Sequence, residues 1–269
     1  MSRAPASSRL LLPEVEVRTL ETRIDHAALF ALLSSLADNK QAIGRQYASW
    51  CSGAPALEAA VAAAAMAQDE LGHARTLYPL LADFAQADPA QVMPTTRTLH
   101  YHLAAFDSGP GGWSDFVALN FLFDTALTTF FEAAQDSHYE PLGQRARKIV
   151  QEERTHFVYG AGWVRRLAGV GGAVRSALAA ALLTLWDETL CWFGPDDDPY
   201  MLQLHHEEVI AVTPAQLRTR YLGTIMLVLS KLEIAVPAAF DETTRTWKLT
   251  RPLPWSSWDT ESRRLRAVS

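Results

Sequence analysis

The segment VAAAAMAQDELGH, residues 61–73, decides the fold class because it joins an alanine run to the spaced pair Glu70 and His73. Alanine is the best helix former, and its small side chain lets neighbouring helices approach closely. Residues three apart on a helix differ by about 60° around the axis and about 4.5 Å along it. A carboxylate and an imidazole at this spacing can therefore reach the same metal ion. The segment predicts a tightly packed helix that carries a potential metal-binding pair.

A second segment, EERTH at 152–156, repeats this pattern with Glu153 and His156. One such pair is weak evidence, but two on separate helices are typical of dimetal carboxylate proteins, which take one further acid from each of two other helices. On antiparallel helices, ligands at equal height lie symmetrically about the intervening turn. Asp124 precedes Glu153 by 29 residues, and their midpoint falls in the turn-like HYEPLG at 138–143. Asp124 therefore meets this condition.

The remaining helix carries a lysine where the same reasoning expects an acid. Lys40 precedes Glu70 by 30 residues, and the midpoint is Pro55, in a turn-like segment. Lys40 lies on an apolar helical stripe with Leu33, Leu36, Ile43 and Tyr47. We therefore expect it to point into the bundle. Asp38, the nearest acid, is rotated by about 200° from Lys40 and should face elsewhere.

Apolar periodicity along the chain predicts an all-α protein. The expected helices cover 25–50, 57–85, 113–135, 145–167, 174–193 and 214–233, with Asp25 and Thr213 as N-caps. Two helical hairpins joined by the long connection 87–112 indicate a four-helix bundle with additional C-terminal helices. We divide the chain into an N-terminal extension, 1–24, a helical domain, 25–237, and an irregular C-terminal tail, 238–269.

Composition excludes several functional classes. The 269 residues include 24 Lys+Arg and 30 Asp+Glu, a net charge of −6, and no basic cluster suited to nucleic acid. Cys51 and Cys191 match no zinc spacing and no disulfide framework, which favours a reducing compartment. No run reaches the roughly 18 uncharged apolar residues of a membrane helix. We therefore expect a cytoplasmic protein with neither a membrane nor a nucleic-acid partner.

Several segments resemble the phenylacetyl-CoA epoxidase family: LADNKQAIGRQYASWCSGAPALE at 36–58, QDELGHARTLY at 68–78, WSDFVALNFLFD at 113–124 and HYEPLGQRARKIVQEERTHF at 138–157. The overall layout is similar to that family's noncatalytic structural subunit, whereas the metal motifs are similar to its catalytic subunit. The resemblance implies a ferritin-like bundle that activates dioxygen at a di-iron centre. By position it implies five of the six iron ligands, which are Glu70, His73, Asp124, Glu153 and His156. The catalytic subunit has Glu where this chain has Lys40.

Two functions follow from this resemblance. The first is an oxygen-activating dimetal oxygenase or oxidase, in which Lys40 acts in the site on a small organic substrate such as a thioester. It would hold two iron ions, with one ion or another transition metal as alternatives, and would receive electrons from a reductase or from the substrate. The second is a noncatalytic structural subunit that binds a catalytic paralogue. The expected assembly is a homodimer or a heterodimer with that paralogue.

The state of Lys40 separates these functions. Three carboxylates offset fewer metal charges than four, and a buried ammonium increases the excess of positive charge. Lys40 can be a neutral amine that binds metal or acts as base or nucleophile, an ammonium paired with Asp124 or Glu70 that displaces metal, or a carbamate. Its amine can also extend out of the bundle to solvent. We expect Gln68 and Glu152, beside the motifs, to be solvated helix residues.

Overall fold

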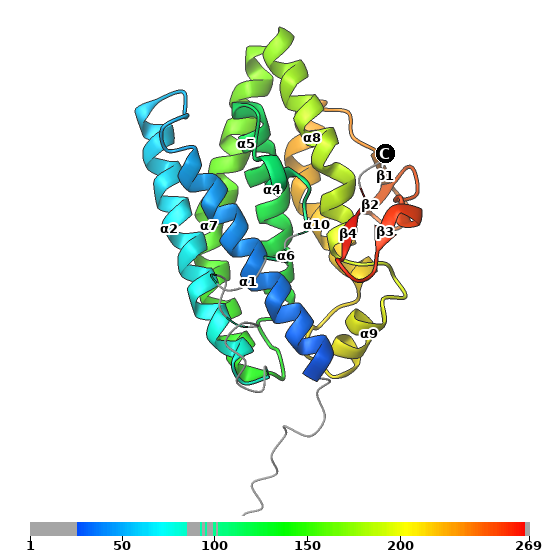
Figure 1. Ribbon diagram of the computed structural model, residues 1–269. Helices are drawn as coiled ribbons and strands as arrows, with labels where there is room; N and C mark the ends of the chain where they lie inside the picture. Colours follow the sequence, from blue (N-terminus) through cyan, green and yellow to red (C-terminus); the bar gives the residue numbers. More distant parts are fainter. Residues whose placement is uncertain (1–25, 85–91, 93–94, 96–98, 101, 267–269) are drawn as a thin grey trace, which may run out of the picture.

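The computed structural model describes residues 26–84, 92, 95, 99–100 and 102–266. Asp25 and the proposed extension, 1–24, lie outside the described residues. Four helical rods form the bundle: α1 (His26–Ser49), α2 (Leu57–Leu81), a composite of α5 (Trp113–Leu119), the π-helix η2 (Asn120–Asp124) and α6 (Thr125–Ala133), and α7 (Glu140–Val170). Figure 1 shows α1 and α2 side by side at one edge, with α7 and the composite rod beside them. The predicted all-α, ferritin-like bundle is confirmed.

Helices α8 (Gly172–Trp192) and α10 (Pro214–Leu229) cover the other side of the composite rod (Figure 1). The shorter helices α4 (Ala105–Ser108) and α9 (Pro199–His206) contact α1, and the 3₁₀ turn η3 (Ser230–Leu232) follows α10. Helix α8 packs on α5 and α7, and α10 packs on α6. Thr213 caps α10 in a capping box with Gln216, as the sequence predicts. Helix α9, which sequence reasoning missed, begins after Asp198, whose side chain accepts two backbone N–H groups.

The chain after Pro237, expected to be irregular, contains two short antiparallel pairs. Strands β1 (Ala238–Asp241) and β2 (Thr246–Leu249) form one pair, and β3 (Trp258–Asp259) and β4 (Arg264–Leu265) form the other after the turn η4 (Trp255–Ser257). Strands this short give too few alternating positions for a pattern to identify them. Ion pairs fasten this region to the helices, including Arg263 to Asp198 at 2.5 Å and Arg251 to Asp187 at 2.9 Å.

Two glycines allow the helices beside the charged residues to approach closely. A Cβ on Gly44 in α1 would lie 2.9 Å from the Leu71 side chain and 3.0 Å from Cβ of Glu70. A Cβ on Gly160 in α7 would collide with Oδ1 of Asn120 in the π-helix. Both contacts are nearer than side chains normally allow, so a glycine is needed at each position.

Helix α7 begins earlier than the periodicity predicts. HYEPLG was expected to be a turn, but the helix starts at Glu140, with Pro141 in its first turn. Proline is well suited to the first helical position because its missing N–H would have no partner there. The span Trp113–Ala133 is the one described helix that is long and apolar enough to cross a membrane, and 89% of its apolar 18-residue stretch is buried inside the fold. This burial is that of a core helix.

Candidate functional site

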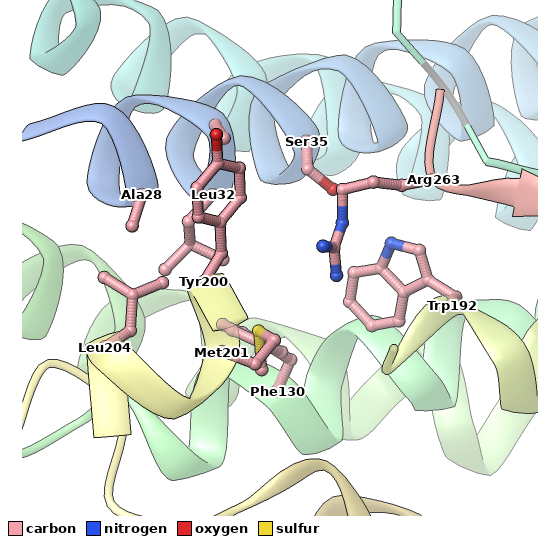
Figure 2. Close-up of a pocket in the computed structure, with 10 residues that line it drawn as sticks. Ala28, Leu32, Ser35, Phe130, Trp192, Tyr200, Met201, Leu204 and Arg263 are labelled. Atoms are coloured by element: carbon pink, nitrogen blue, oxygen red, sulfur yellow. The ribbon is translucent and has the colours of Figure 1, made fainter. Parts of the chain in front are cut away.

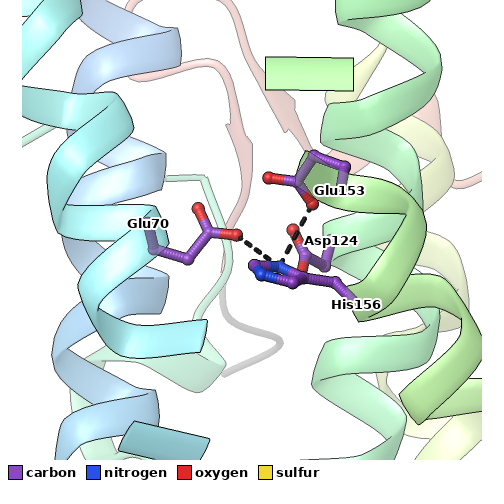
Figure 3. A group of neighbouring side chains, drawn as sticks. All are labelled: Glu70, Asp124, Glu153 and His156. Atoms are coloured by element: carbon purple, nitrogen blue, oxygen red, sulfur yellow. Dashed lines mark hydrogen bonds and ion pairs between the residues drawn. The ribbon is translucent and has the colours of Figure 1, made fainter. Parts of the chain in front are cut away.

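The four rods bring six ionisable side chains to one point in the bundle. Lys40 comes from α1, Glu70 and His73 from α2, Asp124 from η2, and Glu153 and His156 from α7. None is more than 4% exposed, and Lys40 and Glu70 are completely buried. Figure 3 shows Glu70 reaching across from α2 towards Asp124, Glu153 and His156 on the opposite rods. We call these six residues the charged cluster.

Lys40 lies at the centre of the charged cluster. Its Nζ is 2.9 Å from Oε2 of Glu70, 3.1 Å from Oδ1 of Asp124 and 2.5 Å from Oε1 of Glu153. The amine therefore points inward, as its position on the apolar stripe predicts, and does not extend to solvent. Asp38 is elsewhere, where it accepts hydrogen bonds from the Tyr78 hydroxyl and the backbone N–H of His100.

Each imidazole of the charged cluster also contacts an acid that lies outside the cluster. Nδ1 of His156 lies 3.1–3.3 Å from oxygens of Glu70, Asp124 and Glu153, and its Nε2 lies 3.3 Å from Asp69. Nδ1 of His73 lies 3.2 Å from Glu153, and its Nε2 lies 2.7 Å from Glu152. The arrangement is reciprocal, because the outer acid on each of α2 and α7 contacts the imidazole of the other helix.

Asp69 and Glu152 are partners that sequence reasoning missed. Glu152 was expected to be solvated, and its side chain is indeed 38% exposed, but one oxygen binds His73. The signal that identifies the two residues is an acid directly before each E-x-x-H. An acid that accepts a hydrogen bond from one imidazole nitrogen fixes which nitrogen faces the cluster.

Hydroxyl and amide groups complete the surroundings of Asp124 and Glu153. The Tyr47 hydroxyl donates to Oδ2 of Asp124 at 2.9 Å and accepts from the Asn120 amide at 2.8 Å. The Thr128 hydroxyl lies 3.3 Å from Oε2 of Glu153. The π-helical turn, which is common at functional sites, ends at Asp124 and carries Asn120 one turn earlier. Tyr47 belongs to the stripe identified from the sequence, whereas no sequence signal indicated the π-helix.

The four groups of the charged cluster that follow have pKa values shifted from their ordinary ones. Burial lowers the pKa of Lys40, but Asp124, Glu153 and Glu70 together raise it above its ordinary value, so the amine is an ammonium. Burial likewise lowers the pKa of His156, but its contacts with Asp124 and Glu153 raise it overall. Burial raises the pKa of Glu153, yet Lys40 and His156 hold it well below its usual range. Burial and the neighbouring carboxylates raise the pKa of Glu70 well above its usual range.

These charges test whether the site fits metal. Ligand atoms of Glu70, Asp124, Glu153 and His156 lie within 4.8 Å of one another, so this buried group can hold a metal ion. The Lys40 ammonium, however, already contacts all three of those carboxylates. An ammonium and a divalent cation at such short range repel each other strongly in a buried site. With Lys40 in this position, the cluster does not fit a pair of metal ions.

Two openings reach the cluster from opposite sides of α7. A pocket of about 360 Å³ between α6, α7 and α10 is lined in part by Asp124, Glu153 and His156. A groove of about 480 Å³ between α2 and α7 is lined in part by His73 and Glu152. A third pocket, between α1, α8 and α9, has about 20 Å³, room for a water-sized group only (Figure 2). Among these three, the first pocket is lined by the buried carboxylates Asp124 and Glu153.

Comparison with known proteins now identifies the family. The sequence model described as phenylacetic acid catabolic protein matches residues 13–251. The chain belongs to this family. One relative is a subunit of 1,2-phenylacetyl-CoA epoxidase from Escherichia coli strain K12. The two are 26% identical over 211 residues, which cover 78% of this chain and 84% of the relative. The resemblance noted in the sequence is therefore confirmed at the level of the family.

Proposed function

We propose that this member of the phenylacetic acid catabolic family is a noncatalytic subunit of a cytoplasmic, multicomponent oxygenase similar to phenylacetyl-CoA epoxidase. The observation that carries the proposal is the Lys40 ammonium, which contacts Glu70, Asp124 and Glu153 where the resemblance implies metal. Lys40 thus supplies the positive charge that buried carboxylates need, without a metal ion. The relative's name describes one subunit of an epoxidase, which supports a role within an assembly.

In this role the chain would bind a catalytic paralogue, and the charged cluster would hold the four rods in register. Its Lys40 ion pairs join α1 to α2, η2 and α7. The paralogue would supply the metal centre, the dioxygen chemistry and the site for a small organic substrate such as a thioester. A reductase would be a partner of the whole assembly.

Iron content tests this proposal. The full chain is purified anaerobically with Fe(II) supplied, beside Lys40→Glu, which restores the family's acid, and the neutral control Lys40→Gln. We expect far less than one iron per chain in the wild type and a gain of iron in Lys40→Glu. Near-zero iron in both would still support the subunit role and would show that Lys40 is not the sole obstacle to metal. One or two irons in the wild type would contradict the proposal.

A second candidate is the oxygenase itself, with Glu70, His73, Asp124, Glu153 and His156 holding iron or another transition metal. Two observations favour it: the buried group of carboxylates and imidazole that can hold a metal ion, and the 360 Å³ pocket that reaches it. It requires the Lys40 amine to leave the centre of the carboxylates or to lose its proton. Oxygen uptake by the reduced, iron-loaded chain alone would support this candidate, and its absence would exclude it.

A further inference from the structure

Helices α7 and α10 form the two walls of a valley whose floor is α6. Both walls pack on α6, and the pocket of about 360 Å³ opens between all three helices. No Asp or Glu occurs in residues 154–170 of α7 or in residues 214–231, although the chain has 30 acidic and 24 basic residues. The walls of the valley are therefore basic in a protein whose net charge is −6.

Each wall presents the same order of exposed side chains, with a cation at either end and an aliphatic residue between them. The cations, three helical turns apart on each wall, are Arg154 and Arg165 on α7 and Arg220 and Lys231 on α10 and η3. Val158 on α7 is 69% exposed, and Leu227 on α10 is 62% exposed. Side chains at these spacings share one face of a helix, so each aliphatic side chain lies between its two cations.

The positive charge of the valley is not neutralised by the protein itself. Within the described part of the chain, none of the four cations forms an ion pair. Burial raises the pKa of Glu132, and Arg220 and Arg154 act in the opposite direction, so one carboxylate lies near two of the cations. Two copies of this face would bring like charges together, which opposes their association. The charge therefore favours an acidic partner.

The walls of the pocket in the valley are apolar. Four of the lining residues are threonines whose hydroxyl groups donate to the carbonyl oxygen four residues earlier: Thr125, Thr128, Thr129 and Thr224. Their methyl groups are therefore available to a ligand, beside Val150 and Phe157. The buried Asp124, Glu153 and His156 already pair within the charged cluster. A pocket of this kind anchors a bulky apolar side chain at a protein interface.

We propose that the valley is the docking surface for a helix of the catalytic paralogue. That helix would place a bulky apolar side chain in the pocket and acidic residues opposite the cations at both ends of the walls, about 16 Å apart. A helix fits here because the groove between two neighbouring helices accepts the ridge of a third. This inference rests on the proposed function, which requires such a partner, and adds the face that binds it and the chemistry that the partner presents.

Co-purification with the catalytic paralogue of the same organism tests the docking surface. The paralogue is recognised by both E-x-x-H motifs and an acid at the position of Lys40, and it carries an affinity tag. Leu227→Glu, and the double variant Arg154→Glu with Arg220→Glu, should each weaken the complex by about tenfold or more. Rising salt should weaken the wild-type complex as well, because exposed charges contribute to it.

Matched changes on α1 and α2 are the controls. Leu57→Glu, at a side chain that is 76% exposed, and the double variant Arg45→Glu with Arg75→Glu should leave the complex intact. All variants should keep the wild-type melting temperature, because the replaced side chains are exposed. This measurement separates loss of docking from loss of folding.

A complex that is equally strong in the valley variants and the wild type would overturn the docking surface and leave the noncatalytic role standing. If the wild type forms no complex, the docking inference fails, and the iron content of the chain judges the proposed function separately. Two further results would also overturn the inference. Binding to phosphatidylserine vesicles but not to the paralogue would assign the face to a membrane, and a wild-type dimer that Leu227→Glu dissociates would assign it to a second copy of this chain.

Discussion

Nζ of Lys40 lies 2.5 Å from Oε1 of Glu153, and both side chains are completely buried. This ion pair joins the first rod of the bundle to the last. It is also the point at which the chain departs from the dimetal pattern that its two E-x-x-H motifs indicate. Changes to this contact, or to the packing around it, should therefore alter stability in measurable ways.

Replacing Lys40 with methionine should destabilise the protein by about 3–5 kcal/mol, because the carboxylates around Nζ would lose their buried counter-charge. Urea denaturation in the presence of a chelator measures the change. Lys148→Met is the matched control, since that side chain is 69% exposed and its ion pair with Glu152 is 3.8 Å long. Equal stability of Lys40→Met and the wild type would show that the ammonium is not needed.

Stability should fall as pH rises above about 6.5, the ordinary pKa of histidine. Contacts with Asp124 and Glu153 hold the pKa of His156 above that value in the folded state. The folded protein therefore keeps a proton that the unfolded chain releases, and the contribution of His156 is full below the unfolded pKa and declines above it. The slope from this group is at most about 1.4 kcal/mol per pH unit.

Urea denaturation between pH 5.5 and 8.5 checks this slope. His156→Gln should reduce the slope, whereas His138→Gln should not, because the His138 ring is 58% exposed and lies outside the cluster. The same slope in His156→Gln and the wild type would contradict the assignment of charge to His156.

The close helix approaches predict that Gly44→Ala and Gly160→Ala each cost about 1–3 kcal/mol through overpacking. Gly162→Ala, in the same helix as Gly160, is the control, since a Cβ there meets nothing within 4 Å. We expect Gly162→Ala to leave the melting temperature unchanged or to raise it slightly, because alanine favours helix more than glycine does. Thermal melting separates the two groups, and three equal melting temperatures would refute the packing argument.

Tyr47→Phe should lower stability by about 1–3 kcal/mol, because it leaves the Asn120 amide and Oδ2 of Asp124 without the shared hydroxyl. Tyr200→Phe is the control, since Tyr200 is 44% exposed and lies on α9, outside the four rods. Denaturant midpoints measure both changes. A loss in Tyr200→Phe as large as in Tyr47→Phe would point to a general effect of losing a hydroxyl.

Much of the fold followed from the sequence because helical spacing determines which side chains share a face. The i, i+3 pairs and the symmetry about the turns placed Glu70, Asp124 and Glu153 at one height, and the apolar stripe turned Lys40 inward. Their role as metal ligands stays a prediction. The charge of Lys40 could not be read from the sequence, since it depends on distances of a few ångström to three carboxylates on three other elements.

Other features were missed for local reasons. An acid stands directly before each E-x-x-H, but acids are common on the partly exposed side of a helix, so Glu152 was assigned to solvent and Asp69 was passed over. The π-helix ending at Asp124 has the composition of an ordinary helix. Strands β1 and β2 contain four residues each, too few for alternation to be recognised.

The central claim is that the Lys40 ammonium takes the place of metal. The most direct test is a crystal structure of the full chain grown anaerobically with Fe(II), with diffraction data collected at the iron absorption edge. The account predicts no anomalous peak between Lys40 and Asp124, with density for Nζ in contact with Glu70, Asp124 and Glu153. One or two anomalous peaks bound to His73 or His156 would contradict it.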